Sequence, residues 1–313
     1  MPDKKERKGK NNLKNKYDSA WKEVLKKLFK DCLEFFFPDI HKSIDFTKEV
    51  VFLDKELKEI SPHSSQSDRV ADILAKVHLL KDDKIAYIGL ILHVEVQGQQ
   101  EIEFMDRMFT YYYRAYDKEK KEKIPVISLA ILTDGNPNFR PDTFHFQFCG
   151  FEIRMKIPIV KILDYKSKET LIAKLETSHN PMVMVVKAQL KSIEVQGSDN
   201  QKKFEVTKEL MRECGRKGYS RKEIRIMFRF FEWVIRLPEE YNNRLNAVYK
   251  EVEEETKMEF LTSFERVAMK KGKKKGKEED AQKMLKKGFD INTIIEITGL
   301  KRKKLDEIKA SMH

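Results

Sequence analysis

Two acidic residues on neighbouring apolar segments are the residues whose types and spacing best suit chemistry. Asp72 lies in the segment RVADILAKVHLL (69–80), and Glu95 lies in KIAYIGLILHVEVQ (84–97). Both segments are typical of β-strands, and the polar residues Lys81–Lys84 between them indicate a turn. The sequence therefore predicts a hairpin that carries one carboxylate on each strand.

The position of the turn determines which residues face one another. A turn centred on the two aspartates of Lys81–Lys84 makes Asp72 face His93 and lie diagonal to Glu95. One face of the hairpin is then entirely apolar, whereas the other carries Asp72, His93, Glu95 and Gln97 toward one end. We expect the two carboxylates to form a single site.

A pair of acids on strands that are otherwise apolar costs free energy unless a cation or hydrogen-bond donors compensate. Carboxylates at cross-strand distance, joined by a strand carbonyl, water and a phosphate oxygen, suit the octahedral oxygen shell of Mg²⁺, or of Mn²⁺ in its place. Such an ion can activate water to attack a phosphodiester. The alternative is that this face meets solvent and both acids are ordinary surface residues, and a register shift of one residue would separate them.

Composition favours an anionic partner. The 313 residues carry a net charge of +12, with 36% charged and 40% hydrophobic residues, so one large core and a strongly ionic surface are expected. The excess of cations favours nucleic acid first and an acidic membrane surface second. A solvated, Lys-rich surface without a polyanionic partner is the competing interpretation.

Other classes of protein find little support. The three cysteines show neither zinc-ligand spacing nor a disulfide framework, which favours a cytoplasmic location. No apolar segment follows the basic N-terminus as in a signal peptide, and no stretch approaches the length of a membrane span, so no membrane partner is expected. The sequence contains none of the motifs GxSxG, GxxxxGK[ST], GxGxxG and HExxH.

The order of elements around the hairpin predicts the fold class. We expect a helix, three strands, a helix and a strand, followed by a further strand or hairpin, over residues 17–37, 49–57, 69–80, 84–97, 101–119, 124–132 and 143–160. This order is typical of an α/β sheet with helices on its faces. After about residue 165 the sequence is mostly helical.

Changes in composition divide the chain into five parts. We expect a disordered basic arm, the α/β core, a helical extension, a Lys/Gly-rich linker and a small helical tail, over residues 1–16, 17–165, 166–265, 266–280 and 281–313.

The sequence of the tail predicts two helices, a turn at Gly299 and a last helix whose first residues are cationic. This arrangement resembles a helix-turn-helix. In that interpretation its DNA-binding residues are Lys301, Arg302, Lys303 and Lys304. The alternative is a small helical cap or an oligomerisation element.

Several motifs in this order resemble a known family. An Asp followed about two dozen positions later by Glu-x-(Lys or Gln), behind a leading helix, is similar to the PD-(D/E)XK nuclease superfamily. The chain more narrowly resembles the Rpn family of recombination-promoting nucleases and putative transposases. The resemblance covers nearly all residues after 16, through RVADILAKV, HVEVQGQ, FMDRMFTYYYRAYDK, NPMVMVVKAQL, RKGYSRKEIRIMFRFFEWVIRLPEE and KKGFDINTIIEITGLKRKKLDEI.

The resemblance implies a restriction-endonuclease-like core, with a mixed sheet flanked by helices, and a metal-dependent DNA endonuclease of little sequence specificity. Asp72 and Glu95 would hold Mg²⁺ or Mn²⁺, and Gln97 would occupy the position of the superfamily's lysine. Neutral Gln97 can form hydrogen bonds but cannot neutralise charge that develops on the phosphate. Arg107 on the following helix is the expected source of compensating charge, with His93 and Gln99 as further support.

Gln97 keeps a second hypothesis open, in which the chain is a DNA-binding protein built on a degenerate nuclease fold with weak or no catalysis. A homodimer also remains open, since nucleases that cut both strands often pair their sites. The letters EVQG recur at 194–197, but no Asp lies in a position to pair with Glu194. We interpret that second copy as coincidence.

Overall fold

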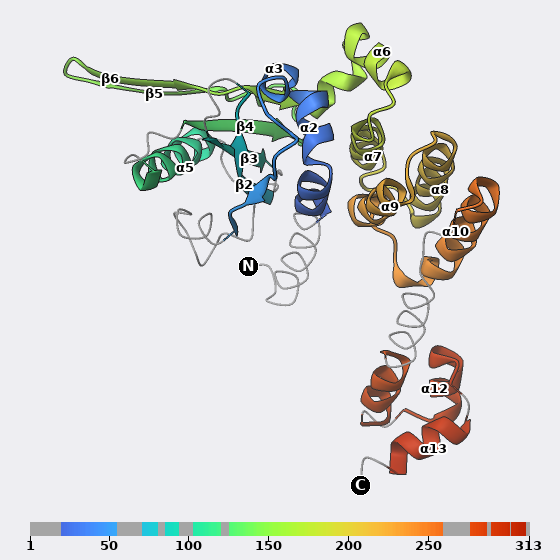
Figure 1. Ribbon diagram of the computed structural model, residues 1–313. Coiled ribbons are helices and arrows are strands. Elements are labelled where there is room, and N and C mark those ends of the chain that lie inside the picture. Colours follow the sequence, from blue (N-terminus) through green and yellow to red (C-terminus); the bar gives the residue numbers. More distant parts are fainter. Residues whose placement is uncertain are drawn as a thin grey trace. The chain divides into compact units, whose positions relative to one another are not determined.

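The computed structural model describes residues 20–54, 71–80, 85–93, 103–119, 125–258, 276–286, 289–300 and 302–310; at 71–72, 85–93, 103, 118–119, 239, 242, 303 and 310 it describes the backbone alone. The chain forms two compact units, Met1–Met258 and Glu259–His313. The first unit combines a mixed sheet with helices, so the predicted α/β class is confirmed (Figure 1).

Five strands form the main sheet. In spatial order they are β1 (Val51–Phe52), β2 (Ala71–His78), β3 (Ile85–His93), β4 (Val126–Leu132) and β7 (Ile159–Lys161). The first three pair antiparallel, whereas β3, β4 and β7 are parallel to one another. The predicted order of helix, three strands, helix and strand is therefore confirmed, although the first strand is much shorter than predicted.

The register of the hairpin differs from the prediction by two residues. Asp72 pairs with Ile91, and not with His93. Because side chains alternate with a period of two, this shift changes every cross-strand partner but leaves the two faces as predicted. The alternation of apolar residues excludes a register that is shifted by one residue, because such a shift would exchange the two faces. The turn Lys81–Lys84 consists only of polar residues, so the sequence does not distinguish between two registers that differ by two residues.

The crossover helix α5 (Glu103–Glu119) covers one face of the sheet (Figure 1). It connects the parallel strands β3 and β4, which cannot be joined by a tight turn. Its apolar stripe packs on β4 in one hydrophobic cluster that contains Phe104, Met105, Met108 and Tyr111 of α5 and Ala130 and Leu132 of β4. The predicted helix is thus confirmed, with its apolar stripe toward the sheet.

The leading helix joins the sheet to the helical part of the same unit. It covers residues 20–27 and α2 (Phe29–Phe36), and the short helix α3 (Pro38–His41) follows at once. Phe29 contacts Phe52 of β1 edge-on, with ring centroids 5.6 Å apart. Trp21, fully buried, meets Phe230 in the same way at 5.0 Å. This helix therefore contributes to two cores at once.

The helical extension follows the strands as predicted. After the 3₁₀ turn η1 (Ile162–Lys166) it consists of α6 (Glu169–Thr177), α7 (Met182–Glu194), α8 (Asn200–Arg216), α9 (Arg221–Ile235), the 3₁₀ turn η2 (Glu239–Tyr241) and α10 (Asn242–Thr256). Ser220 and Glu223 form a capping box that starts α9, since each side chain accepts a hydrogen bond from the other residue's backbone N–H.

The described part of the second unit contains three helices. Its helices are 276–286, α12 (Ile291–Thr298) and α13 (Arg302–Ala310), so the predicted series of three helices is confirmed. Residues 276–280 of the first helix belong to the segment 266–280 that was expected to be a linker. One buried residue or pair from each helix builds the core: Ala281, Ile294, Leu305 and Ile308.

The backbone of the turn before the last helix favours glycine. Gly299 ends α12 in the left-handed conformation, with φ of 64°, and its N–H bonds to the carbonyl of Ile295. Glycine adopts this conformation without strain, which fits the turn predicted at this position.

None of the helices within the described ranges is long and apolar enough to cross a membrane.

A close approach between α8 and α10 gives a stability test. A Cβ built on Gly215 of α8 would lie 2.4 Å from Cγ1 of the buried Val252. Although alanine favours a helix interior by about 1 kcal/mol over glycine, we expect Gly215→Ala to lower the free energy of unfolding by about 1–3 kcal/mol, because overpacking strains a filled core. Urea unfolding followed by circular dichroism measures the change.

Val252→Ala provides the matched background for this test, because it removes the atom that the new Cβ would meet. In that background Gly215→Ala should cost much less, or stabilise the protein. An equal loss in both backgrounds would contradict steric conflict as the cause.

Candidate active site

Four strands present their ends at one edge of the sheet. Because β2 runs antiparallel to β3, it begins where β3, β4 and β7 end. Asp72 is the second residue of β2, His93 is the last of β3 and Lys161 is the last of β7. The carboxyl ends of parallel strands are a frequent location of active sites in α/β sheets.

The register assigns these positions to one face. His93 pairs with Leu132, which pairs in turn with Lys161, and Asp72 belongs to the neighbouring row two residues away. Residues two apart along a strand share a face. Since Leu132 packs in the cluster with α5, this is the face that α5 covers.

The predicted site is described only in part. Asp72 and His93 come to the same edge, but His93 is not the direct partner of Asp72: it takes the diagonal position that was predicted for Glu95. Glu95, Gln97 and Gln99 lie outside the described residues. Nowhere in the described ranges do three His, Cys, Asp or Glu side chains form a group that could hold a metal ion.

Arg107 of α5 has two buried guanidinium nitrogens, Nε and Nη2, without a hydrogen-bond partner among the described residues. Its guanidinium carbon lies 5.6 Å from the ring centroid of Phe104, which is in the cluster against the sheet. Buried guanidinium nitrogens normally have a hydrogen-bond acceptor, so Arg107 is available to bind an anion. It lies on the helix that follows β3, next to this edge of the sheet.

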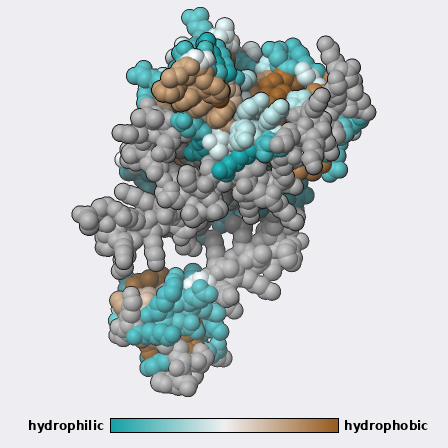
Figure 2. All heavy atoms as spheres, turned by 90° about the vertical axis from the view of Figure 1, so that its left-hand side faces the viewer, coloured by the Kyte–Doolittle hydropathy of each residue, from teal (hydrophilic) through white to brown (hydrophobic). Residues whose placement is uncertain are grey.

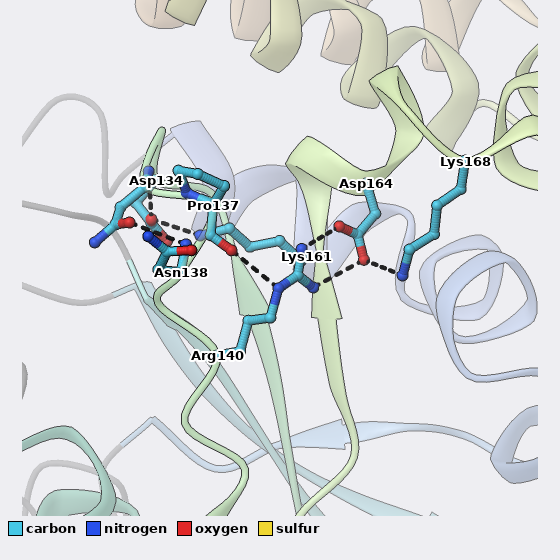
Figure 3. A network of polar contacts seen from close by, with 8 residues as sticks. Asp134, Pro137, Asn138, Arg140, Lys161, Asp164 and Lys168 are labelled. Atoms are coloured by element: carbon cyan, nitrogen blue, oxygen red, sulfur yellow. Dashed lines mark hydrogen bonds and ion pairs between the residues drawn. The ribbon is translucent and has the colours of Figure 1, made fainter.

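A buried ion pair that the sequence did not predict lies at the same edge. Lys161 Nζ lies 2.5 Å from Asp134 Oδ1, with the side chains 1% and 0% exposed (Figure 3). Asp134 follows β4 by two residues, and its Oδ1 also accepts a hydrogen bond of 3.0 Å from the backbone N–H of Asn136. Lys161 Nζ lies 5.8 Å from the ring centroid of Phe139. The pair therefore ties the end of β4 to the end of β7.

The second oxygen of this aspartate is unusual. Asp134 Oδ2 is buried and has no hydrogen-bond partner within the described parts of the chain. The preceding carbonyl, of Thr133, accepts a hydrogen bond of 3.1 Å from Gln189 of α7, which in turn accepts one from Trp21. An unsatisfied buried carboxylate oxygen is costly, and such groups in native proteins often have a functional role or an unseen ligand.

A second ionic network fixes the loop that leaves β4. The Arg140 guanidinium bonds both oxygens of Asp164, and its Nε donates to the carbonyl of Pro137 at 3.0 Å (Figure 3). Lys168 Nζ lies 2.7 Å from the same carboxylate. These partners, Arg140 above all, lower the pKa of Asp164 to about 2. The loop from Asp134 to Arg140 is therefore held at two points.

The sequence does contain a weak signal for Asp134 and Lys161. Asp134 lies in TDGNP (133–137), which follows the apolar segment 124–132 and is typical of a turn, and Lys161 directly follows the segment 143–160. An acid at the carboxyl end of a buried strand could have been taken as a candidate. Its partner could not, since the pairing of β4 with β7 depends on the tertiary fold.

The predicted DNA-binding cations of the second unit differ in their surroundings. Arg302 is exposed at the start of α13. Lys304 pairs with Glu307 at 3.0 Å and with Glu278 at 3.7 Å, and these contacts, the first above all, raise its pKa. Lys301 and the side chain of Lys303 lie outside the described part of the unit.

The second EVQG lies in another context. Glu194 is the last residue of the helix α7, where it pairs with Lys166 and Lys191, each at 3.0 Å. Its side chain is thus part of a surface ionic cluster, which supports the interpretation of the repeat as coincidence.

Comparison of the chain with protein-family models, with curated proteins and with solved structures found no significant match.

The buried pair leads to a paired stability test. Removing the cation alone, in Lys161→Met, leaves a buried unpaired carboxylate, and we expect it to lower the free energy of unfolding by about 3–5 kcal/mol. Removing both charges, in Asp134→Asn/Lys161→Met, should recover most of that loss, since Asn retains an acceptor for the Asn136 N–H. Denaturant unfolding measures both. Equal losses in the single and double variants would contradict a strong interaction between the two charges.

Proposed function

We propose that this chain is a metal-dependent DNA endonuclease with a PD-(D/E)XK-type core that resembles the Rpn family. The observation that carries the proposal is the convergence of strand ends: β2, with Asp72 at its start, begins where β3 ends, and Glu95 follows β3 by two residues in the sequence. A leading helix, antiparallel strands and a crossover helix to a parallel strand give the element order that the resemblance implies.

The chemistry of this edge is compatible with a divalent cation. Asp72 and Glu95 would be the ligands, and carboxylate oxygens are what Mg²⁺ and Mn²⁺ prefer. The buried, unpartnered Oδ2 of Asp134 is a further anionic atom at this edge for which the described residues provide no donor. When bound, the ion would polarise the scissile phosphodiester and lower the pKa of a water molecule.

The remaining residues would act by binding and orientation. Gln97 donates a hydrogen bond to a phosphate oxygen in this proposal, and Arg107 supplies the positive charge that glutamine lacks. Lys161 is too deeply buried to reach substrate, at 1% side-chain exposure, and is a positioning residue that fixes the ends of β4 and β7. The net charge of +12 provides long-range attraction for DNA.

The first test of the proposal is plasmid cleavage. Purified protein should nick or linearise supercoiled plasmid with Mg²⁺ or Mn²⁺ and should lose this activity with EDTA. Asp72→Asn and Glu95→Gln should each reduce the rate at least about 100-fold while DNA binding persists, because each removes a ligand charge from the ion. Gel electrophoresis follows cleavage, and filter binding follows affinity.

Glu176→Gln is the matched control, since it makes the same chemical change at an exposed position of α6. It should cleave like the wild type. Undiminished cleavage by Asp72→Asn and Glu95→Gln would sink the assignment. Metal-independent DNA binding without cleavage, together with no Mn²⁺ affinity in calorimetry at millimolar concentration, would instead establish the degenerate nuclease, the alternative that Gln97 favours.

The cations of α13 allow a separate test of DNA contact. Arg302→Glu should weaken DNA binding and lower the slope of log affinity against log salt by about 1, as expected for one lost phosphate contact. Lys304→Gln should have a smaller effect, because its ammonium already pairs with Glu278 and Glu307. Fluorescence anisotropy over a salt series measures both. Identical salt dependence in the wild type and Arg302→Glu would exclude Arg302 as a phosphate contact.

A further inference from the structure

A two-stranded ribbon projects from the first unit and belongs to no larger sheet (Figure 1). Its strands, β5 (Thr143–Phe148) and β6 (Phe151–Lys156), pair along their whole length. The turn consists of Cys149 and Gly150, with φ of 47° and 84°, as a two-residue hairpin turn with positive φ at both positions requires. A two-stranded ribbon is marginally stable alone, so it normally packs against a further layer.

One face of this ribbon is entirely apolar. The register brings Phe144 opposite Met155, Phe146 opposite Ile153 and Phe148 opposite Phe151, all on the same side. At the base of the ribbon the face is covered: Phe144 stacks on Phe109 of α5, with centroids 4.4 Å apart, and with Met155 it packs against the hydrophobic cluster under α5. The apolar face therefore continues the hydrophobic core outward from the domain.

The outer part of the same face is uncovered. Phe146, Phe148 and Phe151 are 50%, 68% and 57% exposed. Seen from the side toward which the ribbon points, the first unit presents hydrophobic residues beside hydrophilic ones on its surface (Figure 2). Three large aromatic rings left in water on one short element are unusual for a monomeric protein and indicate a surface that another molecule covers.

The charges of the ribbon identify the class of partner. Residues 142–156 contain two acids, Asp142 and Glu152, and two bases, Arg154 and Lys156, so the segment is neutral in a chain of net charge +12. All four belong to the polar side or base of the ribbon, where Glu152 lies 3.1 Å from His145 and Lys156 lies 3.6 Å from Asp142. No Lys or Arg shares the apolar face, so phosphate contacts cannot accompany base stacking there, as nucleic acid would require.

A second copy of the chain fits these properties. Two chains of charge +12 repel one another over most of their surfaces, but not where both are neutral. The three exposed rings leave on the order of 350 Å² of apolar surface per copy, if each phenylalanine side chain presents about 200 Å². If apolar area makes up about 60% of an interface, two such faces correspond to about 1,100–1,200 Å² in total, which exceeds the roughly 1,000 Å² that a biological interface needs.

We propose that two copies of this chain associate through their β5–β6 ribbons, apolar face against apolar face about a two-fold axis. The contact is isologous, because the same residues of each copy meet, and closed, because the covered face leaves no further site for a third copy. This inference is independent of the proposed nuclease activity.

Equilibrium sedimentation of the full chain tests the proposal. The wild type should form dimers with a dissociation constant on the order of micromolar, as expected for an interface of this size. Phe148→Ser/Phe151→Ser should raise that constant at least about 100-fold, since it removes two of the three exposed aromatic anchors. The positions are exposed, so the variant should keep the wild-type circular dichroism and unfolding midpoint. Gln147→Ser, on the polar face of the same strand, is the control and should leave the constant unchanged.

Cys149 provides a second readout at the end of the ribbon, since Cys32 and Cys214 are buried. A nitroxide label attached to Cys149 should give an intermolecular distance by pulsed electron resonance in the wild type, and none in Phe148→Ser/Phe151→Ser. A monomer at every accessible concentration, or a dimer that survives in the double variant, would overturn the proposal. So would a monomer whose ribbon variant loses affinity for anionic phospholipid vesicles or DNA.

Discussion

The buried contact between Asp134 and Lys161 is the interaction on which the edge of the sheet depends. A carboxylate and an ammonium that are both excluded from water must remain together, because either alone would be an uncompensated charge in the interior. The pair therefore joins two parallel strands that share only three rows of backbone pairing. Hydrophobic packing is non-directional and does not by itself fix the ends of β4 and β7 relative to one another.

This constraint extends to both faces of the sheet. On one face, α5 packs on β4 through its apolar stripe and carries Arg107 near the same edge. On the other side, Gln189 links the carbonyl of Thr133 to Trp21, so the helical part of the unit also contacts the end of β4. A site at this edge would accordingly be supported by two layers of helices, which is how rigid elements hold catalytic groups within a fraction of an ångström.

Local patterns predicted the elements of the fold well, because each was encoded by nearby residues. The alternation of polar and apolar residues identified the β2–β3 hairpin and its faces, and the three- and four-residue spacing identified α5. Register was less accessible, since the polar turn accepts more than one centre. The Asp134–Lys161 pair was inaccessible, because 27 residues separate its members and only the parallel pairing of β4 and β7 unites them. The ribbon was foreseen as a strand or hairpin, but its exposure was not, since the same pattern fits a buried strand.

The connection between β4 and β7 has a further consequence. These strands are neighbours in the sheet, and the whole β5–β6 ribbon lies between them in the sequence as an excursion that leaves and returns at one edge. Its two ends are clamped together by contacts outside the ribbon, of which the pair between the ends of β4 and β7 is the deepest. The ribbon can therefore change in length by pairs of residues without altering the sheet.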